Sequence, residues 1–177
     1  MKNFAVIKNK IKKFNKNIFV PGDKSLSIRT VLLASQGVGV SNISNLLEAE
    51  DVLNSLAAIK KLGIKYTKVK KKYRIYGLGL NGYSPKKNTT IYAGNSGTLG
   101  RHLLALLVKV NKKIKLTGDR SLSKRDFSRI AEPLKLFGAN IKLNNKFLPV
   151  DIVGTNFLRP INYFENIGSA QVKSSIC

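Results

Sequence analysis

The sequence is built on an internal repeat of about 72 to 75 residues, and this repeat limits the folds that the chain can adopt. Matching residues recur at this spacing: Gly22 and Gly94, Arg29 and Arg101, and Gly63 and Gly138. The last pair follows two segments with helical spacing of apolar residues, where glycine is a typical stop. We therefore expect similar structural units packed together.

Each unit is predicted to run β-α-β-α-β-β, because apolar residues switch between the helical and the strand spacing in the same order. In the first unit the predicted elements are a strand at 17–22, a helix at 26–34, a strand at 38–43, a helix at 51–62, and strands at 64–69 and 73–76. In the second unit they are 89–94, 99–108, 113–116, 127–137, 141–143 and 150–153. The fold class is therefore α/β.

A third unit is expected to begin near residue 160 and to stop after its first loop, which is Gly168-Ser169-Ala170-Gln171. A helix starting near Gln171 would reach the last residue, Cys177, in mid-turn. We therefore expect two complete units, at about 18–88 and 89–158, and a truncated third unit at 159–177.

The step from the first strand into the first helix holds the most distinctive polar residues of every unit. These are Lys24, Ser25 and Arg29 in the first loop, Asn95, Gly97, Thr98 and Arg101 in the second, and Ser169 and Gln171 in the third. A helix start offers unpaired N–H groups and the positive end of the helix dipole, which favours a bound anion. The alternative is that these residues are only helix caps and tight turns. Three loops in register favour a site, and Arg125 is placed to reach the same anion.

A formal charge of +23 would suit a protein that binds nucleic acid. The alternative is a lysine-rich surface without a particular partner. The lysines are scattered over turns and helix ends and do not alternate with aromatic residues, as a base-stacking surface requires. This pattern favours the solvated surface, and nucleic acid is an unlikely partner.

The remaining reactive residues point away from metal and disulfide chemistry. Cys177 is the single cysteine, which fits a reducing compartment, and we expect a cytoplasmic location. One histidine, His102, with one cysteine does not make a metal site. Glu48, Glu50 and Asp51 form the densest acidic cluster and are expected to cap the helix that follows. No apolar run approaches the roughly 20 residues that cross a bilayer, so no membrane is expected as a partner.

The loop sequences resemble the signatures of the 5-enolpyruvylshikimate-3-phosphate synthase family, in order, from about residue 18 to the end. The matching segments are Pro21-Gly-Asp-Lys24-Ser25-Leu-Ser-Ile-Arg29, Leu46-Leu47 through Asp51-Val52, Gly94-Asn95-Ser96-Gly97-Thr98-Leu-Gly-Arg101, Thr117 through Arg125, and Ser169-Ala170-Gln171. Two positions depart from the family pattern. Ser96 replaces an alanine, and Asp126 replaces a proline, which offers Arg125 an ion pair that would weaken its hold on a phosphate.

The resemblance implies the enolpyruvyl transferase fold, an inside-out α/β barrel of repeated units, with the active site between two domains. Residues 1–17 would pack in the second domain, and the full enzyme would be a monomer without cofactor or metal. The implied reaction transfers the enolpyruvyl group of phosphoenolpyruvate to the 5-hydroxyl of shikimate-3-phosphate. The family's proton-transfer acid and base would lie beyond residue 177, so no catalytic residue is expected in this chain, which would be inactive alone.

The resemblance also assigns binding roles to matching positions. Lys24 would contact both substrates, Ser25 and Arg29 the carboxylate side of shikimate-3-phosphate, and Ser169, Ala170 and Gln171 its phosphate and ring. Gly97 and Arg125, with Lys24 and Gln171, would hold phosphoenolpyruvate or its mimic, the herbicide glyphosate. A related family acting on UDP-N-acetylglucosamine is the nearest alternative. It has Lys-Asn where this chain has Lys24-Ser25, and usually a reactive cysteine that this chain lacks.

Overall fold

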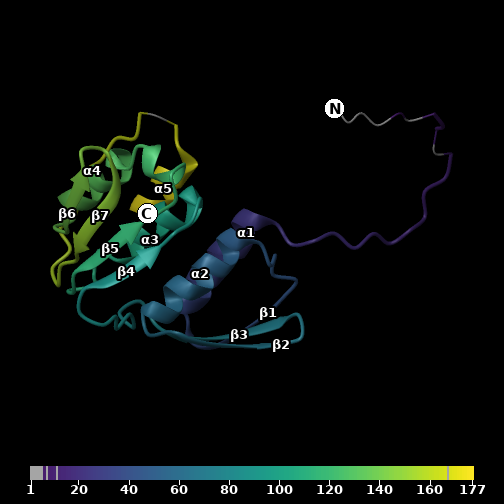
Figure 1. Ribbon diagram of the computed structural model, residues 1–177, viewed down its shortest axis with the longest axis horizontal. Helices are drawn as coiled ribbons and strands as arrows, with labels where there is room; N and C mark the ends of the chain where they lie inside the picture. The colour runs from purple at the N-terminus through teal and green to yellow at the C-terminus, as the bar shows by residue number, and fades with distance from the viewer. Residues whose placement is uncertain (1–5, 7, 11, 167) are drawn as a thin grey trace.

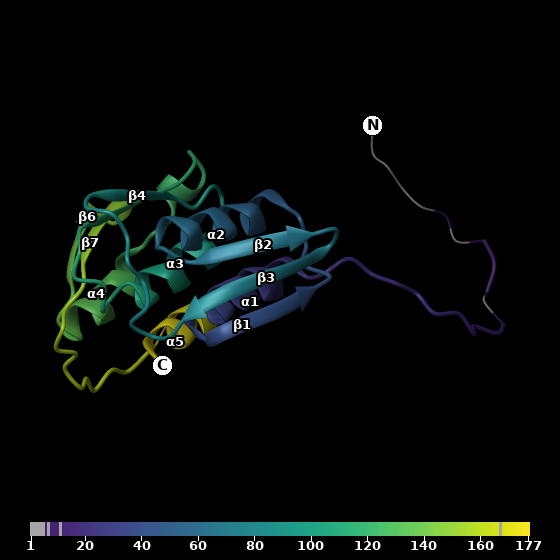
Figure 2. The ribbon, with the colours of Figure 1, turned by 90° about the horizontal axis from the view of Figure 1, so that it is seen from below.

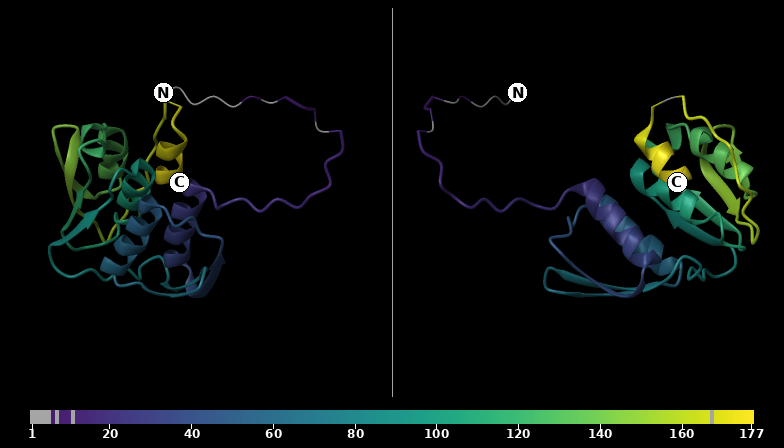
Figure 3. Two further views of the ribbon diagram at one scale, coloured as in Figure 1. Left: turned by 45° about the vertical axis from the view of Figure 1, so that its right-hand side comes forward. Right: turned by 180° about the vertical axis from the view of Figure 1, so that it is seen from behind.

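The computed structural model describes residues 6, 8–10, 12–166 and 168–177. Two α/β units lie side by side, each with helices against one face of a β-sheet (Figures 1 and 2). Helix α3 of the second unit contacts α1 of the first unit and also α5, the last helix of the chain (Figure 3). The starts of helices from all three repeats are therefore close together.

The first unit consists of α1 (Lys24–Gln36), β1 (Val38–Ser44), α2 (Glu50–Lys61), β2 (Lys65–Val69) and β3 (Lys72–Leu78). Its three strands form an antiparallel sheet in the order β1-β3-β2. Alternate residues of β3 are buried, as expected for a sheet with one covered face. The helices and the hairpin therefore confirm the sequence prediction, with ends shifted by one to two residues.

The second unit consists of β4 (Thr89–Tyr92), α3 (Gly97–Leu106), β5 (Ile114–Thr117), a short 3-10 turn (Leu122–Lys124), α4 (Ser128–Leu136), β6 (Asn140–Asn144) and β7 (Phe147–Val153). The sheet order is β4-β5-β7-β6, and β4 pairs parallel with β5. This is the predicted β-α-β-α-β-β order. Helix α5 (Ala170–Ile176) follows a long segment without helix or strand and confirms the helix expected near Gln171.

Two predicted strands are wrong. Residues 17–22 form no strand. They belong to an extended segment that leads away from the two units (Figure 3). The Val20 carbonyl accepts a 3.4 Å hydrogen bond from Asn45 Nδ2, one residue past the end of β1. The chain then passes so close to Asn45 that a Cβ on Gly22 would clash with the Asn45 carbonyl oxygen. Likewise, the described residues near 160 form no first strand for the third unit.

The expected 1–17 segment is only partly described, since residues 1–5, 7 and 11 lie outside the described residues. Its described residues form no helix or strand, and its packing in another domain stays a prediction. Across the described chain, none of the helices has the length and apolar character needed to span a bilayer.

A single apolar cluster joins the helices to the sheets and fixes the helix starts. Ile28 of α1, Ile59 of α2 and Ile75 of β3 are fully buried in it, as are Leu103 and Leu104 of α3. The buried positions on each helix follow the three-to-four-residue spacing that the sequence shows. Burial of this face orients each helix, so the residues at the helix starts have defined positions.

Candidate functional site

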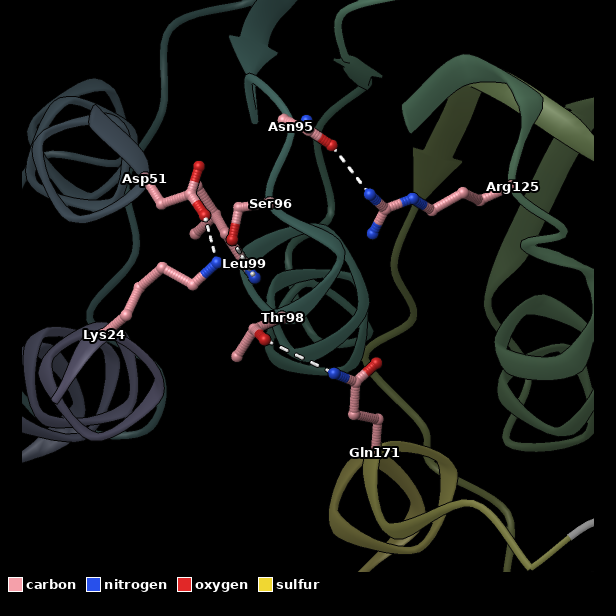
Figure 4. A network of polar contacts seen from close by, with 8 residues as sticks. All are labelled: Lys24, Asp51, Asn95, Ser96, Thr98, Leu99, Arg125 and Gln171. Carbon is pink, nitrogen blue, oxygen red and sulfur yellow. Dashed lines mark hydrogen bonds and ion pairs between the residues drawn. The ribbon is translucent and has the colours of Figure 1, made fainter. Parts of the chain in front are cut away.

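A polar cleft of about 320 Å³ lies where α1, α2, α3 and α5 begin. Figure 4 shows several of its side chains pointing toward one another from these separate helices. The cleft is lined by Lys24, Glu50, Asp51, Asn95, Ser96, Gly97, Thr98, Arg125 and Gln171. Six of these residues were predicted from the sequence to lie at an anion site: Lys24, Asn95, Gly97, Thr98, Arg125 and Gln171.

The helix caps follow the repeat. The side chains of Asp23, Ser96 and Ser169 accept hydrogen bonds from the backbone N–H groups of Leu26, Leu99 and Val172, at 2.7, 3.1 and 3.4 Å. These three residues are spaced 73 apart. The cap interpretation therefore applies to one residue per loop, and Ser96, the departure from the family pattern, serves as the cap of α3.

Lys24 is paired with a carboxylate in the cleft. Its Nζ lies 3.1 Å from Asp51 Oδ2, and the lysine side chain is 55% exposed while the aspartate is 14% exposed. The ammonium group is the exposed partner of this pair, so a dianionic ligand can reach it from the cleft. Glu50 and Asp51 lie in the first turn of α2, where the sequence predicts acidic residues to favour the helix dipole, but neither caps the helix by a side-chain hydrogen bond. Their place beside Lys24 depends on how α2 packs against α1.

Arg125 reaches the cleft from the 3-10 turn and is held by Asn95. Its Nη2 donates a 2.7 Å hydrogen bond to Asn95 Oδ1 (Figure 4). The expected ion pair between Arg125 and Asp126 is wrong. Asp126 Oδ1 instead accepts hydrogen bonds from the backbone N–H and the hydroxyl of Ser128, at 2.7 and 2.6 Å. These bonds lower the pKa of Asp126 and leave Arg125 available to an anion.

Gly97 lies between two guanidinium groups at the start of α3. A Cβ at this position would be 3.1 Å from Arg125 Nη1 and 3.2 Å from Arg101 Nη1, which is tighter than ordinary contact. Hydrogen in place of a side chain therefore leaves room for a small anion to approach the loop and Arg125 together.

Gln171 enters the cleft from α5 and contacts the second loop. Its Oε1 accepts a 2.6 Å hydrogen bond from Arg101 Nη1, and its Nε2 donates to Thr98 Oγ1 at 3.3 Å. Arg101 was predicted to face the anion directly, but among the described residues it contacts Gln171 and is absent from the cleft lining. Burial, and then the charges of Arg125 and Arg129, lower its pKa.

The other predicted binding residues lie outside this cleft in the described chain. Ser25 and Ala170 occupy the first turns of α1 and α5, and Ser169 is the cap of α5. Arg29 lines a separate cavity of about 240 Å³ together with His102. Their binding roles, like those of the cleft residues, stay predictions.

His102 is buried and unsuited to bind a metal. Its Nδ1 lies 3.4 Å from Ser175 Oγ, and its Nε2 has no hydrogen-bond partner in the described part of the chain. Burial and the neighbouring Arg29 and Arg101 lower its pKa, so the ring is neutral at pH 7. The described residues contain no cluster of three or more His, Cys, Asp or Glu that would hold a metal ion.

Comparison with known proteins places these loops in a family context. Residues 8–177 match the family model described as EPSP synthase (3-phosphoshikimate 1-carboxyvinyltransferase). The protein named 3-phosphoshikimate 1-carboxyvinyltransferase from Vesicomyosocius okutanii is 42% identical over 160 residues, which cover 90% of this chain and 37% of that relative. A protein of the same name from Oceanobacillus iheyensis is 39% identical over 161 residues, which cover 90% of this chain and 37% of that relative.

A solved structure agrees with the sequence relatives. EPSP synthase from Acinetobacter baumannii superposes with a TM-score of 0.82 at 39% identity, covering 90% of this chain and 36% of that one. This likeness confirms the expected enolpyruvyl transferase fold. The chain spans about 37% of the length of the curated relatives that it matches. With the family signature loops gathered at one cleft and a match that runs through almost every residue, the chain belongs to the EPSP synthase family.

Proposed function

We propose that this chain supplies one side of an active site that transfers the enolpyruvyl group of phosphoenolpyruvate to the 5-hydroxyl of shikimate-3-phosphate. This step belongs to the shikimate pathway of aromatic amino acid biosynthesis. The reaction joins two polyanions by addition and elimination and releases phosphate, so its site must neutralise several negative charges. Within the cell we expect it to occur in the cytoplasm, with the full enzyme a monomer.

The observation that supports this proposal is the convergence of Lys24, Arg125 and Gln171 on one polar cleft from three separate helices or turns. Lysine and arginine form strong charge-assisted hydrogen bonds with phosphate and carboxylate oxygens. The starts of α1 and α3 add the positive ends of two helix dipoles. Gly97 leaves space beside Arg125 for the smaller substrate, phosphoenolpyruvate.

The family resemblance places the proton-transfer acid and base beyond residue 177. In the cleft itself, the carboxylate of Asp51 is paired with Lys24. We therefore expect residues 1–177 to bind substrate but to show no turnover by themselves.

Turnover in a completed enzyme tests the proposal. Residues 1–177 would be joined to the matching C-terminal part of a relative, and phosphate release from phosphoenolpyruvate and shikimate-3-phosphate would be measured. We expect turnover that Lys24→Ala and Arg125→Ala reduce strongly and that Lys146→Ala, at an exposed turn, leaves unchanged. Turnover that survives Lys24→Ala would contradict the assignment of this cleft.

The charge of +23 supports a second candidate function, which is non-catalytic binding of nucleic acid. Nonspecific binding to duplex DNA would fall steeply with salt, because released counterions drive it. A salt titration with random duplex DNA, beside a titration with shikimate-3-phosphate, separates the two. Tight, salt-sensitive DNA binding without any shikimate-3-phosphate binding would favour the alternative.

A further inference from the structure

The side-chain amide of Gln171 is held in one orientation by two residues of α3. Arg101 Nη1 donates to its oxygen at 2.6 Å, and its nitrogen donates to Thr98 Oγ1 at 3.3 Å. We propose that Arg101 and Thr98 are positioning residues that make Gln171 offer an N–H donor, not a carbonyl acceptor, to a substrate oxygen in the cleft. This inference rests on the proposed function for the identity of the substrate.

The orientation follows from which groups can donate. A guanidinium has only donors, so the amide oxygen must face Arg101; the reversed amide would place two donors against each other. The amide nitrogen then faces Thr98, as Figure 4 shows. One of its two N–H bonds is directed to the Thr98 hydroxyl, which leaves the second available on the side of the cleft that Gln171 lines.

Arg101 is itself well fixed. It is half-buried, and its guanidinium carbon lies 5.6 Å from the centre of the Phe127 ring, within the range of a cation–π contact. Because its hydrogen bond goes to a neutral amide, its charge is not neutralised by this contact and adds to the positive potential behind the cleft. A mobile surface arginine would not orient its partner in this way.

The repeat explains why residues of the second unit can form hydrogen bonds with Gln171 of the third unit. Ser25, Thr98 and Gln171 are spaced 73 apart and occupy the same place in successive units. In the third unit this place carries an amide, and the second unit supplies both of its hydrogen-bond partners. The contact therefore couples α5 to α3 at the cleft, in addition to their apolar packing.

Side-chain order of Gln171 tests the positioning directly in the 177-residue chain. The probe is ¹⁵N relaxation of its NH₂ group, compared among the wild type, Arg101→Met and Thr98→Val. We expect an ordered amide in the wild type and an order parameter below about 0.6 in each variant, the value typical of flexible groups. Thr117→Val, the same change at a threonine whose hydroxyl donates to Ile91 O, is the control and should leave Gln171 unchanged. Unchanged order in Thr98→Val and Arg101→Met would overturn the proposal; should Arg101→Met unfold, Thr98→Val alone decides.

The donor role needs a second variant. Gln171→Glu keeps an oxygen for Arg101 but removes the N–H and adds a negative charge, so its hydrogen bond to Arg101 should persist while shikimate-3-phosphate binds more weakly for both reasons. Thr98→Val should weaken binding by about threefold to tenfold, as expected for one net hydrogen bond. Gln171→Glu with unchanged affinity would show that Gln171 does not donate. If the wild type does not bind shikimate-3-phosphate at all, the proposed function fails, and the amide order still decides whether Arg101 and Thr98 position Gln171.

Discussion

Replacing Gly97 by alanine should separate the stability of the fold from ligand binding. The added methyl would lie 3.1 Å from Arg125 Nη1 and 3.2 Å from Arg101 Nη1, whereas ordinary contacts are 3.4–4 Å. The Arg125 guanidinium must therefore retreat by about 0.3 Å and that of Arg101 by about 0.2 Å to reach ordinary contact. Their hydrogen bonds, 2.7 Å to Asn95 and 2.6 Å to Gln171, can lengthen by these amounts and stay within the usual range.

The expected cost to folding is therefore small. Gly97 is not among the glycines with positive φ, so alanine is compatible with its backbone and should stabilise the chain by about 0.4–1 kcal/mol through the unfolded state, which offsets part of the strain. We expect the free energy of unfolding of Gly97→Ala to stay within about 1 kcal/mol of the wild type, measured by urea unfolding of the 177-residue chain.

A ligand has less room to adjust. A methyl group at the floor of the cleft overpacks a bound anion, at a cost of about 1–3 kcal/mol, or roughly fivefold to a hundredfold in affinity. The loss of affinity should be near the upper value for the longer inhibitor glyphosate and near the lower value for phosphoenolpyruvate. In the completed enzyme, the inhibition constant for glyphosate should therefore rise much more than the Michaelis constant for phosphoenolpyruvate. Equal changes in the two constants would refute the placement of this loop against phosphoenolpyruvate.

Three further changes test the fold that supports the cleft. Asp23→Ala removes the cap of α1 and should cost about 1 kcal/mol in thermal or urea unfolding, whereas Asp23→Asn should cost little; equal losses would contradict the cap. Leu104→Ala in the core should lower the free energy of unfolding by about 2–5 kcal/mol, whereas Leu33→Ala at an exposed position should lower it by less than about 0.5 kcal/mol. A small loss of stability in Leu104→Ala would show that α3 is not packed as described. Hydrogen bonds from Ser128 hold the pKa of Asp126 below its ordinary value, so its stabilising contribution is present above the unfolded pKa of about 3.9 and is lost as the pH falls through the folded pKa. Asp126→Asn should therefore flatten the acid side of the stability curve, and an unchanged acid limb would count against the Ser128 contacts.

The local elements were predictable because their signals lie within a few residues. Apolar spacing locates α1, α2 and α3, and the repeat locates the second unit from the first. Strand pairing is different, because it depends on a partner far along the chain. Residues 89–92 and 17–20 have similar patterns, yet Thr89 pairs with Ile114 while the earlier segment pairs with no strand and is hydrogen-bonded through Val20 to Asn45, just past β1.

The site was predictable in its composition but not in its internal contacts. Helix starts and the repeat were enough to nominate Lys24, Gly97, Arg125 and Gln171. Sequence spacing says little about where a long side chain points, so the contact from Arg101 to Gln171 was missed. Asp126 shows the same limit. Its neighbour Arg125 suggested an ion pair, whereas the start of α4 offered the carboxylate two closer donors.

We infer that one cleft, at the starts of α1, α2, α3 and α5, binds shikimate-3-phosphate. The most direct test is a titration of the ¹⁵N-labelled 177-residue chain with this ligand, followed residue by residue in ¹H–¹⁵N spectra. We expect saturable shifts concentrated at Lys24, residues 95–98, Arg125 and Gln171, which are lost in Lys24→Ala and kept in Lys146→Ala. Shifts spread over the surface lysines, or the same shifts with inorganic phosphate at equal affinity, would contradict it.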